Sequence, residues 1–299
     1  DINFTGFAAG DFFGSGVGSA GDVNGDGFED LIIGAYANDD GGSNAGAAYI
    51  YFGNETMDNQ FDINLTGPTP SGQFGYMALT AGDVNGDGFA DVVIGANNND
   101  DIQEPNFQGG AAYVFYGNST MDNQFDLNLT GTEGMINLGE SLSDAGDVNG
   151  DGYDDIIIGA RIWDAGPPNV GAAYIYFGNE SMDNGVDKII FVEKTGQGNY
   201  VTSLGDVNSD GYDDVFVGAS GNDDIVTNAG SAFIYFGGEN MDIELDSNLT
   251  GTTSLGSFGY AISSAGDFDG GGIPDIIVSA RQDVGSQGRA YIYLGENRI

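Results

Sequence analysis

The chain contains neither cysteine nor histidine, and this double absence excludes several kinds of chemistry. Disulfide bonds, thiolate or imidazole metal ligands, cysteine nucleophiles and serine–histidine pairs cannot be built without these side chains. Any metal site must therefore use oxygen ligands, which are the ligands that hard cations prefer.

Basic residues are also scarce, because 6 lysines and arginines stand against 46 aspartates and glutamates, a formal net charge of −40. A chain of this sign is repelled by nucleic-acid phosphates and anionic lipids, so we expect no nucleic-acid partner. No apolar run approaches the roughly 20 residues of a membrane-spanning helix, so we expect a soluble chain without membrane insertion. Its 299 residues, 40% of them apolar, are enough for a substantial core.

An acidic cluster recurs five times. The first copy reads DVNGDGFED, and the copies begin at Asp22, Asp83, Asp147, Asp206 and Asp267. Two other markers keep the same phase, GAAYIYFG at 46–53 and DINLTG at 62–67. One unit of about sixty residues has therefore been copied five times, and we predict a single domain over residues 1–299. Its repeats run approximately over 1–61, 62–125, 126–190, 191–245 and 246–299.

Each unit contains the patterns of four short strands. The run after the cluster, such as DLIIGA, is continuous and β-branched, which is typical of a strand covered on both faces. AAYIYF is aromatic and β-branched, DINLT alternates, and the segment before the cluster supplies a fourth strand. The sequence thus predicts an all-β fold, a β-propeller of five four-stranded blades. Five blades are favoured over a fragment of a larger propeller, because an N-terminal DINFTG strand would complete a last blade that ends on AYIYLG.

Four of the clusters place oxygen-bearing side chains at loop positions 1, 3, 5 and 9, with glycine at position 6 for a sharp turn. Calcium suits this arrangement best, because it accepts six to eight oxygens from carboxylates, backbone carbonyls and water. Position 7 would contribute its carbonyl oxygen. The predicted ligands are Asp22, Asn24, Asp26, Phe28 and Asp30; Asp83, Asn85, Asp87, Phe89 and Asp91; Asp147, Asn149, Asp151, Tyr153 and Asp155; Asp206, Asn208, Asp210, Tyr212 and Asp214; and Asp267, Asp269, Ile273 and Asp275.

The fifth copy departs from the pattern because Gly271 stands at position 5. We therefore expect four strong calcium sites and a weaker fifth one. An EF-hand is excluded, since position 12, where that loop needs glutamate, is apolar, as at Ile33. The spacing of the copies and the apolar strands after them argue against a dockerin module.

Together these features resemble FG-GAP repeats, the blades of the integrin α-subunit head. The resemblance rests on the calcium loops, the IIGA-type strands and the FG pairs at Phe13-Gly14, Phe74-Gly75 and Phe258-Gly259, and it covers essentially the whole chain. It implies that each calcium loop joins the first two strands of a blade on the lower face and that ligands bind the upper face. Two features depart from the family, which usually closes seven blades: five copies are present, and the fourth lacks FG.

No pair of acidic residues is singled out for catalysis, and each loop offers about as many oxygens as calcium accepts. We therefore expect a structural metal and no enzymatic activity. Recognition is expected in the upper-face loops, which vary on a constant frame. There Arg161, Trp163 and Asp164 are the candidate ligand-binding residues, with Trp163 either a stacking platform or packed on the Pro167-Pro168 turn.

The sequence thus predicts a secreted or cell-surface calcium-stabilised propeller that acts as an adhesion or lectin-like module for a protein or glycan ligand. One alternative is a structural subunit of a surface layer or extracellular filament, which would bind copies of itself. A less favoured one is the accessory propeller of a polysaccharide-degrading enzyme. An extracellular location follows from the loop type, for which dissociation constants of roughly 10⁻⁴ to 10⁻³ M are typical.

Overall fold

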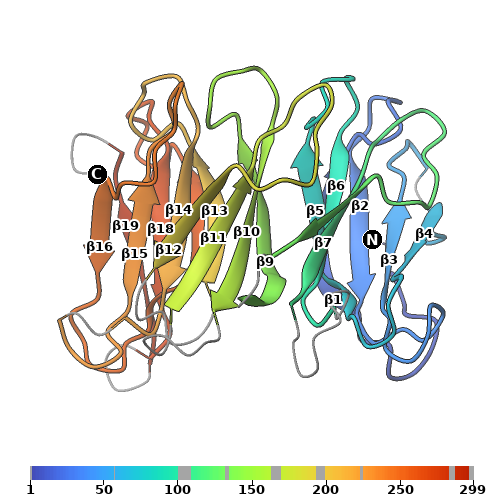
Figure 1. The fold of residues 1–299 in the computed structure, drawn as a ribbon, viewed down its shortest axis with the longest axis horizontal. Coiled ribbons are helices and arrows are strands. Elements are labelled where there is room, and N and C mark those ends of the chain that lie inside the picture. The colour runs from blue at the N-terminus through green and yellow to red at the C-terminus, as the bar shows by residue number, and fades with distance from the viewer. Residues whose placement is uncertain are drawn as a thin grey trace. The chain divides into compact units, whose positions relative to one another are not determined.

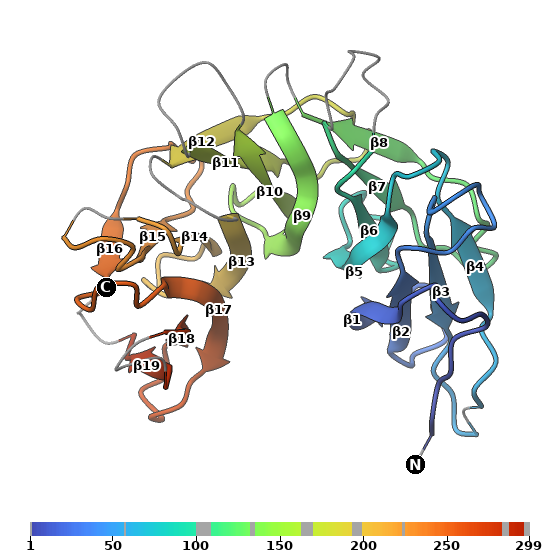
Figure 2. The ribbon, with the colours of Figure 1, turned by 90° about the horizontal axis from the view of Figure 1, so that it is seen from below.

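The computed structural model of the protein describes residues 2–56, 58–99, 109–131, 135–162, 170–192, 199–222, 225–282 and 287–295. Within these ranges the chain forms β-strands and no helix, which confirms the all-β fold (Figures 1 and 2). The described part of the chain accordingly holds no helix that could cross a membrane.

The strands form five sheets, whose recorded pairings are antiparallel. The first contains β1 (Phe13–Gly21), β2 (Asp30–Ala35), β3 (Ala47–Tyr51) and β4 (Ile63–Thr66). The second contains β5 (Phe74–Gly82), β6 (Asp91–Ala96), β7 (Ala111–Phe115) and β8 (Leu127–Thr130). The third contains β9 (Met135–Gly146), β10 (Asp155–Ile162), β11 (Val170–Tyr176) and β12 (Lys188–Val192). The fourth contains β13 (Asn199–Gly205), β14 (Asp214–Ala219), β15 (Ser231–Tyr235) and β16 (Ser247–Thr250). The fifth contains β17 (Phe258–Gly266), β18 (Asp275–Ala280) and β19 (Arg289–Tyr293).

Each sheet joins its strands in chain order, which is the blade architecture of a β-propeller. The predicted four strands per blade are present in four sheets, and the fifth has three within the described residues. The repeat marker at 62–67 contains β4, which pairs with β3 of the preceding repeat. The sheets are therefore offset by one strand from the repeat boundaries suggested by the sequence.

The chain divides into two compact units, Asp1–Leu142 with Gly178–Gly185, and Ser143–Phe177 with Val186–Ile299. Each unit has its own apolar core. In the first unit, Ile50, Phe74 and Tyr113 are buried together between the first two sheets. In the second, one core cluster includes Ile175 and Val217, and another includes Phe216 and Ile276.

The FG pairs shape the first strand of a blade and its contact with the preceding one. Gly75 has φ +84°, a conformation that favours glycine, and it lies within a β-bulge of β5 between Phe74 and Ala78. Phe74 also forms an isolated parallel bridge with Gly46, where a Cβ atom would clash with the Phe74 carbonyl oxygen. The FG pair of one blade and the GAA marker of the preceding blade are therefore in contact where the two blades pack together. β13 pairs from Asn199 without such a bulge, as expected for the copy that lacks FG.

The N-terminal DINFTG segment differs from its expected form, because residues 2–12 form no strand. Phe4 packs on Tyr51 with ring centroids 4.5 Å apart, and Phe7 packs on Tyr49 at 5.0 Å. These contacts hold the segment against the first sheet. Residues 2–12 form no β-bridge with a described strand, and a strand conformation depends on such a partner.

Candidate metal centres

The five acidic clusters form the hairpin loops that join the first and second strands of the sheets. β1 ends at Gly21 and β2 begins at Asp30, so loop positions 1–8 lie between the strands and position 9 opens the second one. The same boundaries recur in the other four sheets. This is the location that the FG-GAP resemblance implied.

The aspartate at position 1 organises the backbone of its loop. In the first loop, the Asp22 carboxylate accepts hydrogen bonds from the amides of Gly25 at 2.8 Å, Asp26 at 3.0 Å and Gly27 at 2.8 Å. The Asn24 side chain accepts from the Asp26 amide at 2.8 Å and donates to the Asp26 carboxylate at 3.1 Å. The chain thus curls around a group of oxygen atoms at positions 1, 3 and 5.

The position 1 pattern is repeated in the second, third and fourth loops. Asp83, Asp147 and Asp206 each accept from the amides at positions 5 and 6 of their own loops, at 2.9 to 3.1 Å. Gly27, at position 6 of the first loop, has φ +91° and an open surrounding, so its conformation rather than space requires glycine. Four loops therefore share one local geometry.

The aspartate at position 9 is buried and joins two parts of its blade. Asp30 accepts from the Val23 amide at 3.0 Å and from the Gly53 amide, after β3, at 2.7 Å. Asp91 and Asp214 repeat both bonds with the corresponding amides. The carboxylate therefore connects the loop to the end of the third strand.

Burial raises the pKa of these carboxyl groups, although the two backbone hydrogen bonds partly oppose it. The pKa of Asp30 rises to about 6, and those of Asp91 and Asp214 to about 7. In the first loop the Asp26 and Asp22 carboxylates raise it further. Carboxylate, amide and carbonyl oxygens are hard donors, and a divalent cation among them would supply the counter-charge. The residues present therefore fit calcium.

In the fifth loop the three carboxylates converge. Oxygens of Asp267, Asp269 and Asp275 lie within 4.8 Å of one another, the one such group of three or more acidic residues in the described ranges. Asp269 stands where the other loops have asparagine, so the fifth loop keeps three carboxylates despite Gly271. That the fifth site binds calcium most weakly stays a prediction. A smaller number of charged ligands does not support it, because the fifth loop has three carboxylate ligands like the others.

Neighbouring loops are also hydrogen-bonded to one another within each unit. The Ala90 amide donates to the Asp22 carbonyl at 3.1 Å, and the Asp213 amide donates to the Asp147 carbonyl at 3.1 Å. The Asp213 carboxylate additionally accepts from the Asp147 amide at 3.0 Å. Sequence reasoning missed Asp213, and its signal was an acidic residue at position 8 of the third and fourth copies.

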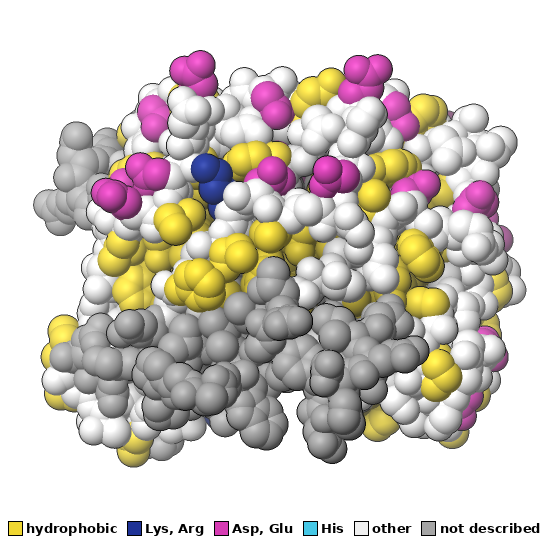
Figure 3. Space-filling view, viewed as in Figure 1, with side chains coloured by type: hydrophobic (Ala, Val, Ile, Leu, Met, Phe, Trp, Pro, Cys, Tyr) yellow, Lys and Arg dark blue, Asp and Glu magenta, His cyan; other side chains and the backbone are white. Residues whose placement is uncertain are grey.

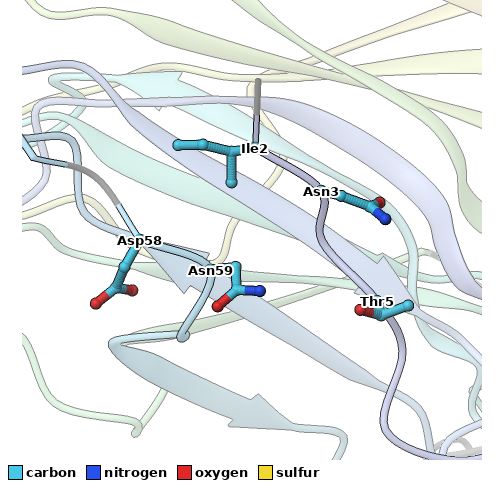
Figure 4. Close-up of a pocket in the computed structure, with 5 residues that line it drawn as sticks. All are labelled: Ile2, Asn3, Thr5, Asp58 and Asn59. Carbon is cyan, nitrogen blue, oxygen red and sulfur yellow. The ribbon is translucent and has the colours of Figure 1, made fainter.

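The described structure does not test the predicted ligand-binding residues. Trp163 and Asp164 lie outside the described residues, and of Arg161 only the backbone is described, paired with Gly171 in β10 and β11. A shallow hollow of about 400 Å³ lies elsewhere, lined by Ile2, Asn3, Thr5, Asp58 and Asn59 (Figure 4). It offers one carboxylate and no basic side chain.

Comparison with known proteins places this geometry in a family. A model described as FG-GAP-like repeat matches residues 22–94, and one described as FG-GAP repeat matches 75–115, 142–176, 198–235 and 258–293. The chain belongs to the FG-GAP repeat family. Each match contains at least one complete acidic loop, so the family assignment and the hairpin geometry concern the same part of each repeat.

Integrin α subunits are among the curated relatives of this FG-GAP chain. Integrin alpha-8 of Mus musculus is 33% identical over 215 residues, which are 68% of this chain and 19% of the relative. Integrin alpha-8 of Gallus gallus is 30% identical over 240 residues, 76% of this chain and 21% of the relative. Integrin alpha-5 of Xenopus laevis is 33% identical over 168 residues, which are 53% of this chain and 15% of the relative. The chain thus spans about a fifth or less of the length of these relatives.

Proposed function

We propose that the chain is a calcium-stabilised, non-enzymatic β-propeller module of an extracellular or cell-surface protein, and that it binds a protein or glycan ligand. The observation that carries the proposal is the geometry repeated in four loops, in which position 1 holds a half-buried aspartate, position 5 an exposed one and position 9 a buried one. The FG-GAP family and the integrin α relatives support an adhesive, ligand-binding role.

The proposed ligands of each ion are the side chains at positions 1, 3, 5 and 9 and the carbonyl at position 7. When bound, calcium would neutralise carboxylates that otherwise repel one another within a tight hairpin. The chain itself positions these groups: the loop amides orient the Asp22 carboxylate, and the amides of Val23 and Gly53 orient that of Asp30. We infer a structural role for the ion, with ligand recognition at the opposite ends of the strands.

Calcium titration tests the first part of this proposal. Isothermal calorimetry on chelator-treated protein should show binding with dissociation constants of roughly 10⁻⁴ to 10⁻³ M, as for extracellular modules. Asp26→Ala, which removes an exposed side chain, should lose one site and keep the fold, whereas Asp39→Ala, outside the loops, should lose none. Half-saturation at micromolar calcium or below would argue for an intracellular sensor instead.

Ligand binding needs its own test. A screen of matrix proteins and glycans, with calcium and with chelator, should find a partner that binds only the calcium-loaded protein. Absence of binding in both conditions would remove the adhesive role and leave the calcium proposal intact. Activity on polysaccharides should be absent, and measurable cleavage would overturn the non-enzymatic part.

Association with copies of the same chain is a second candidate, and one observation favours it. β3, β7 and β15 are buried at every position, whereas β19 exposes Arg289, Ala290 and Ile292. An exposed apolar strand is a template for pairing with another chain. Sedimentation in millimolar calcium should then show assemblies larger than a monomer.

A further inference from the structure

Two aromatic clusters, one in each unit, share two residues that stand at corresponding positions of their repeats. In the first unit, Phe12 stacks on Tyr36 with ring centroids 5.1 Å apart, and Tyr36 contacts Tyr76 at 5.8 Å. In the second unit, Tyr200 contacts Tyr260 at 5.2 Å, and the guanidinium of Arg281 lies 4.6 Å from the centre of the Tyr260 ring. We call Tyr200, Tyr260 and Arg281 the Arg281 cluster.

The correspondence is one of sequence and of strand position. Tyr36 and Arg281 each follow the last alanine of a second strand, at the ends of β2 and β18. Tyr76 and Tyr260 each follow a Phe-Gly pair at the start of a first strand. In each strand this end is the one away from the calcium loop. The clusters therefore lie on the side where the family resemblance places ligands. Tyr36 and Tyr76 belong to neighbouring sheets, whereas Arg281 and Tyr260 belong to one sheet, and only the second cluster contains a cation.

Arg281 packs on aromatic neighbours, and no acidic side chain of the described residues pairs with its charge. The Tyr200 hydroxyl and the Arg281 guanidinium beside the Tyr260 hydroxyl lower the pKa of Tyr260. No ion pair joins Arg281 to any residue in the described ranges, although the chain has 46 acidic residues and 6 basic ones. Arg281 is exposed, and Tyr200 is 37% exposed. A guanidinium that lies over a ring still presents the N–H groups at its edge to a partner.

We propose that the Arg281 cluster binds the carboxylate of an aspartate or glutamate side chain on a protein partner. The proposal deepens the ligand-binding function proposed above and rests on it. Guanidinium matches a carboxylate in planarity and can donate two parallel hydrogen bonds, and the phenol hydroxyl of Tyr260 adds a donor beside it. The fixed position of Arg281 over Tyr260 reduces the entropy lost on binding.

The surrounding charge favours a protein segment over an acidic polysaccharide. With a net charge of −40, the chain repels a polymer that carries a carboxylate on every unit, and Figure 3 shows many acidic and few basic side chains on the face in view. A single acidic side chain among neutral or basic neighbours meets the lone guanidinium without that repulsion. We therefore infer a partner whose contact segment is neutral or basic around one carboxylate.

A pair of peptides tests this inference on the full chain in calcium. The probe is a blocked heptapeptide with one aspartate flanked by glycine and two lysines, and its control has asparagine at the same place. Binding is followed by fluorescence polarisation, and by NMR of the tyrosine ring signals. We expect the aspartate peptide to bind at least about tenfold more tightly, the scale of a charge-assisted hydrogen bond. Non-specific attraction to the acidic chain would favour the asparagine peptide, which is more positive.

The chain supplies its own control substitution. Arg281→Tyr reproduces the residue that stands at the corresponding position of the first sheet, Tyr36, so the fold should tolerate it, and unchanged circular dichroism and melting temperature verify this. It should abolish the preference for aspartate. Arg281→Lys keeps the charge but not the two parallel donors, and should lose about half of the effect in free energy.

Three outcomes would overturn the inference. One is equal binding of the two peptides to the native chain, and another is an unchanged preference in the Arg281→Tyr variant. The third is Arg281-dependent binding of trigalacturonate without binding of the aspartate peptide, which would assign the cluster to glycans. If a matrix protein found in the screen binds the native chain and Arg281→Tyr equally, ligand binding stands and this inference fails.

Discussion

The first and fifth acidic loops carry the same number of predicted carboxylate ligands, three, in different surroundings. In the first loop, the residue at position 2 is Val23, which is fully buried. In the fifth loop it is Phe268, which is 68% exposed. The strand that receives the position 9 carboxylate differs in the same way, since β3 is buried throughout and β19 is largely exposed. The formal charge of a loop is therefore not enough to rank its proposed calcium site.

The internal bonding of the two loops differs as well. Asn24 separates the carboxylates of the first loop and hydrogen-bonds to Asp26, whereas Asp269 in the fifth loop brings a third carboxylate close to the other two. Like charges at that separation raise the energy of the calcium-free loop. The fifth loop thus has closer carboxylates and more exposed neighbouring side chains than the first, although its position 9 carboxylate, Asp275, is buried like that of Asp30.

Calcium removal should have the largest effect. In 2 mM calcium, a site with a dissociation constant near 10⁻⁴ M contributes about 1.8 kcal/mol to the free energy of unfolding, so four such sites lower the melting temperature by roughly 10 °C or more when emptied. Differential scanning calorimetry with and without chelator measures this. An unchanged curve would remove the basis for comparing the loops as calcium sites.

The burial of position 9 should appear in calcium-free protein as a difference between two alanine variants. Asp91→Ala leaves the amides of Val84 and Gly117 without their acceptor in a buried place, at a cost of about 2 to 4 kcal/mol. Asp275→Ala frees the amides of Phe268 and Gly295. Asp275 is also buried, but its bond to Phe268 is only partly buried and lies beside an exposed side chain, so water replaces the carboxylate there, at a cost of about 1 to 2 kcal/mol. Urea unfolding in chelator compares them. Equal losses would show that burial does not distinguish the two loops.

The repeat made the fold predictable from sequence, because its signals are local. The runs DLIIGA and DVVIGA became β2 and β6 with the expected bounds, and the acidic clusters became the hairpins between first and second strands. Five copies of one weak pattern support one another where a single copy would be ambiguous. The strand alternation and the turn glycines of each copy point to the same structure.

The contacts between repeats could not be predicted in this way. The bond from the Asp147 amide to the Asp213 carboxylate joins residues 66 positions apart, and it depends on how two blades pack. Within one repeat, the hydrogen bond from the Gly53 amide to the Asp30 carboxylate likewise depends on tertiary packing, because the third strand must pass beside the loop. The cluster of Tyr200, Tyr260 and Arg281 combines three strands or strand ends, so no single motif marks it.

A smaller effect should appear with pH in calcium-free protein. The folded-state pKa values of Asp91 and Asp214, about 7, lie above the ordinary 3.8, so the folded state binds more protons than the unfolded state between these values. The stability that these groups contribute is complete below pH 4 and is lost as the pH rises through 7. With chelator, the melting temperature should therefore be a few degrees higher at pH 5 than at pH 8. Asp91→Asn should flatten this slope, and a melting temperature that rises with pH would contradict the assignment.

The smallest expected effect comes from giving the fifth loop the ligand order of the first. The double variant Asp269→Asn with Gly271→Asp keeps three carboxylates and moves one from position 3 to position 5. Gly271 is not among the residues with positive φ, so aspartate fits its backbone conformation.

If ligand order limits the calcium affinity of the fifth loop, the variant should bind calcium about three- to tenfold more tightly. If burial limits the affinity, it should not change. Hydrogen exchange of the Asp267–Asp275 amides at graded calcium gives the midpoint for this loop alone, with the Asp22–Asp30 amides as internal reference. Because Phe268 stays exposed in the variant, we expect a change at the lower end of that range, and a midpoint equal to that of the first loop would show that burial contributes nothing.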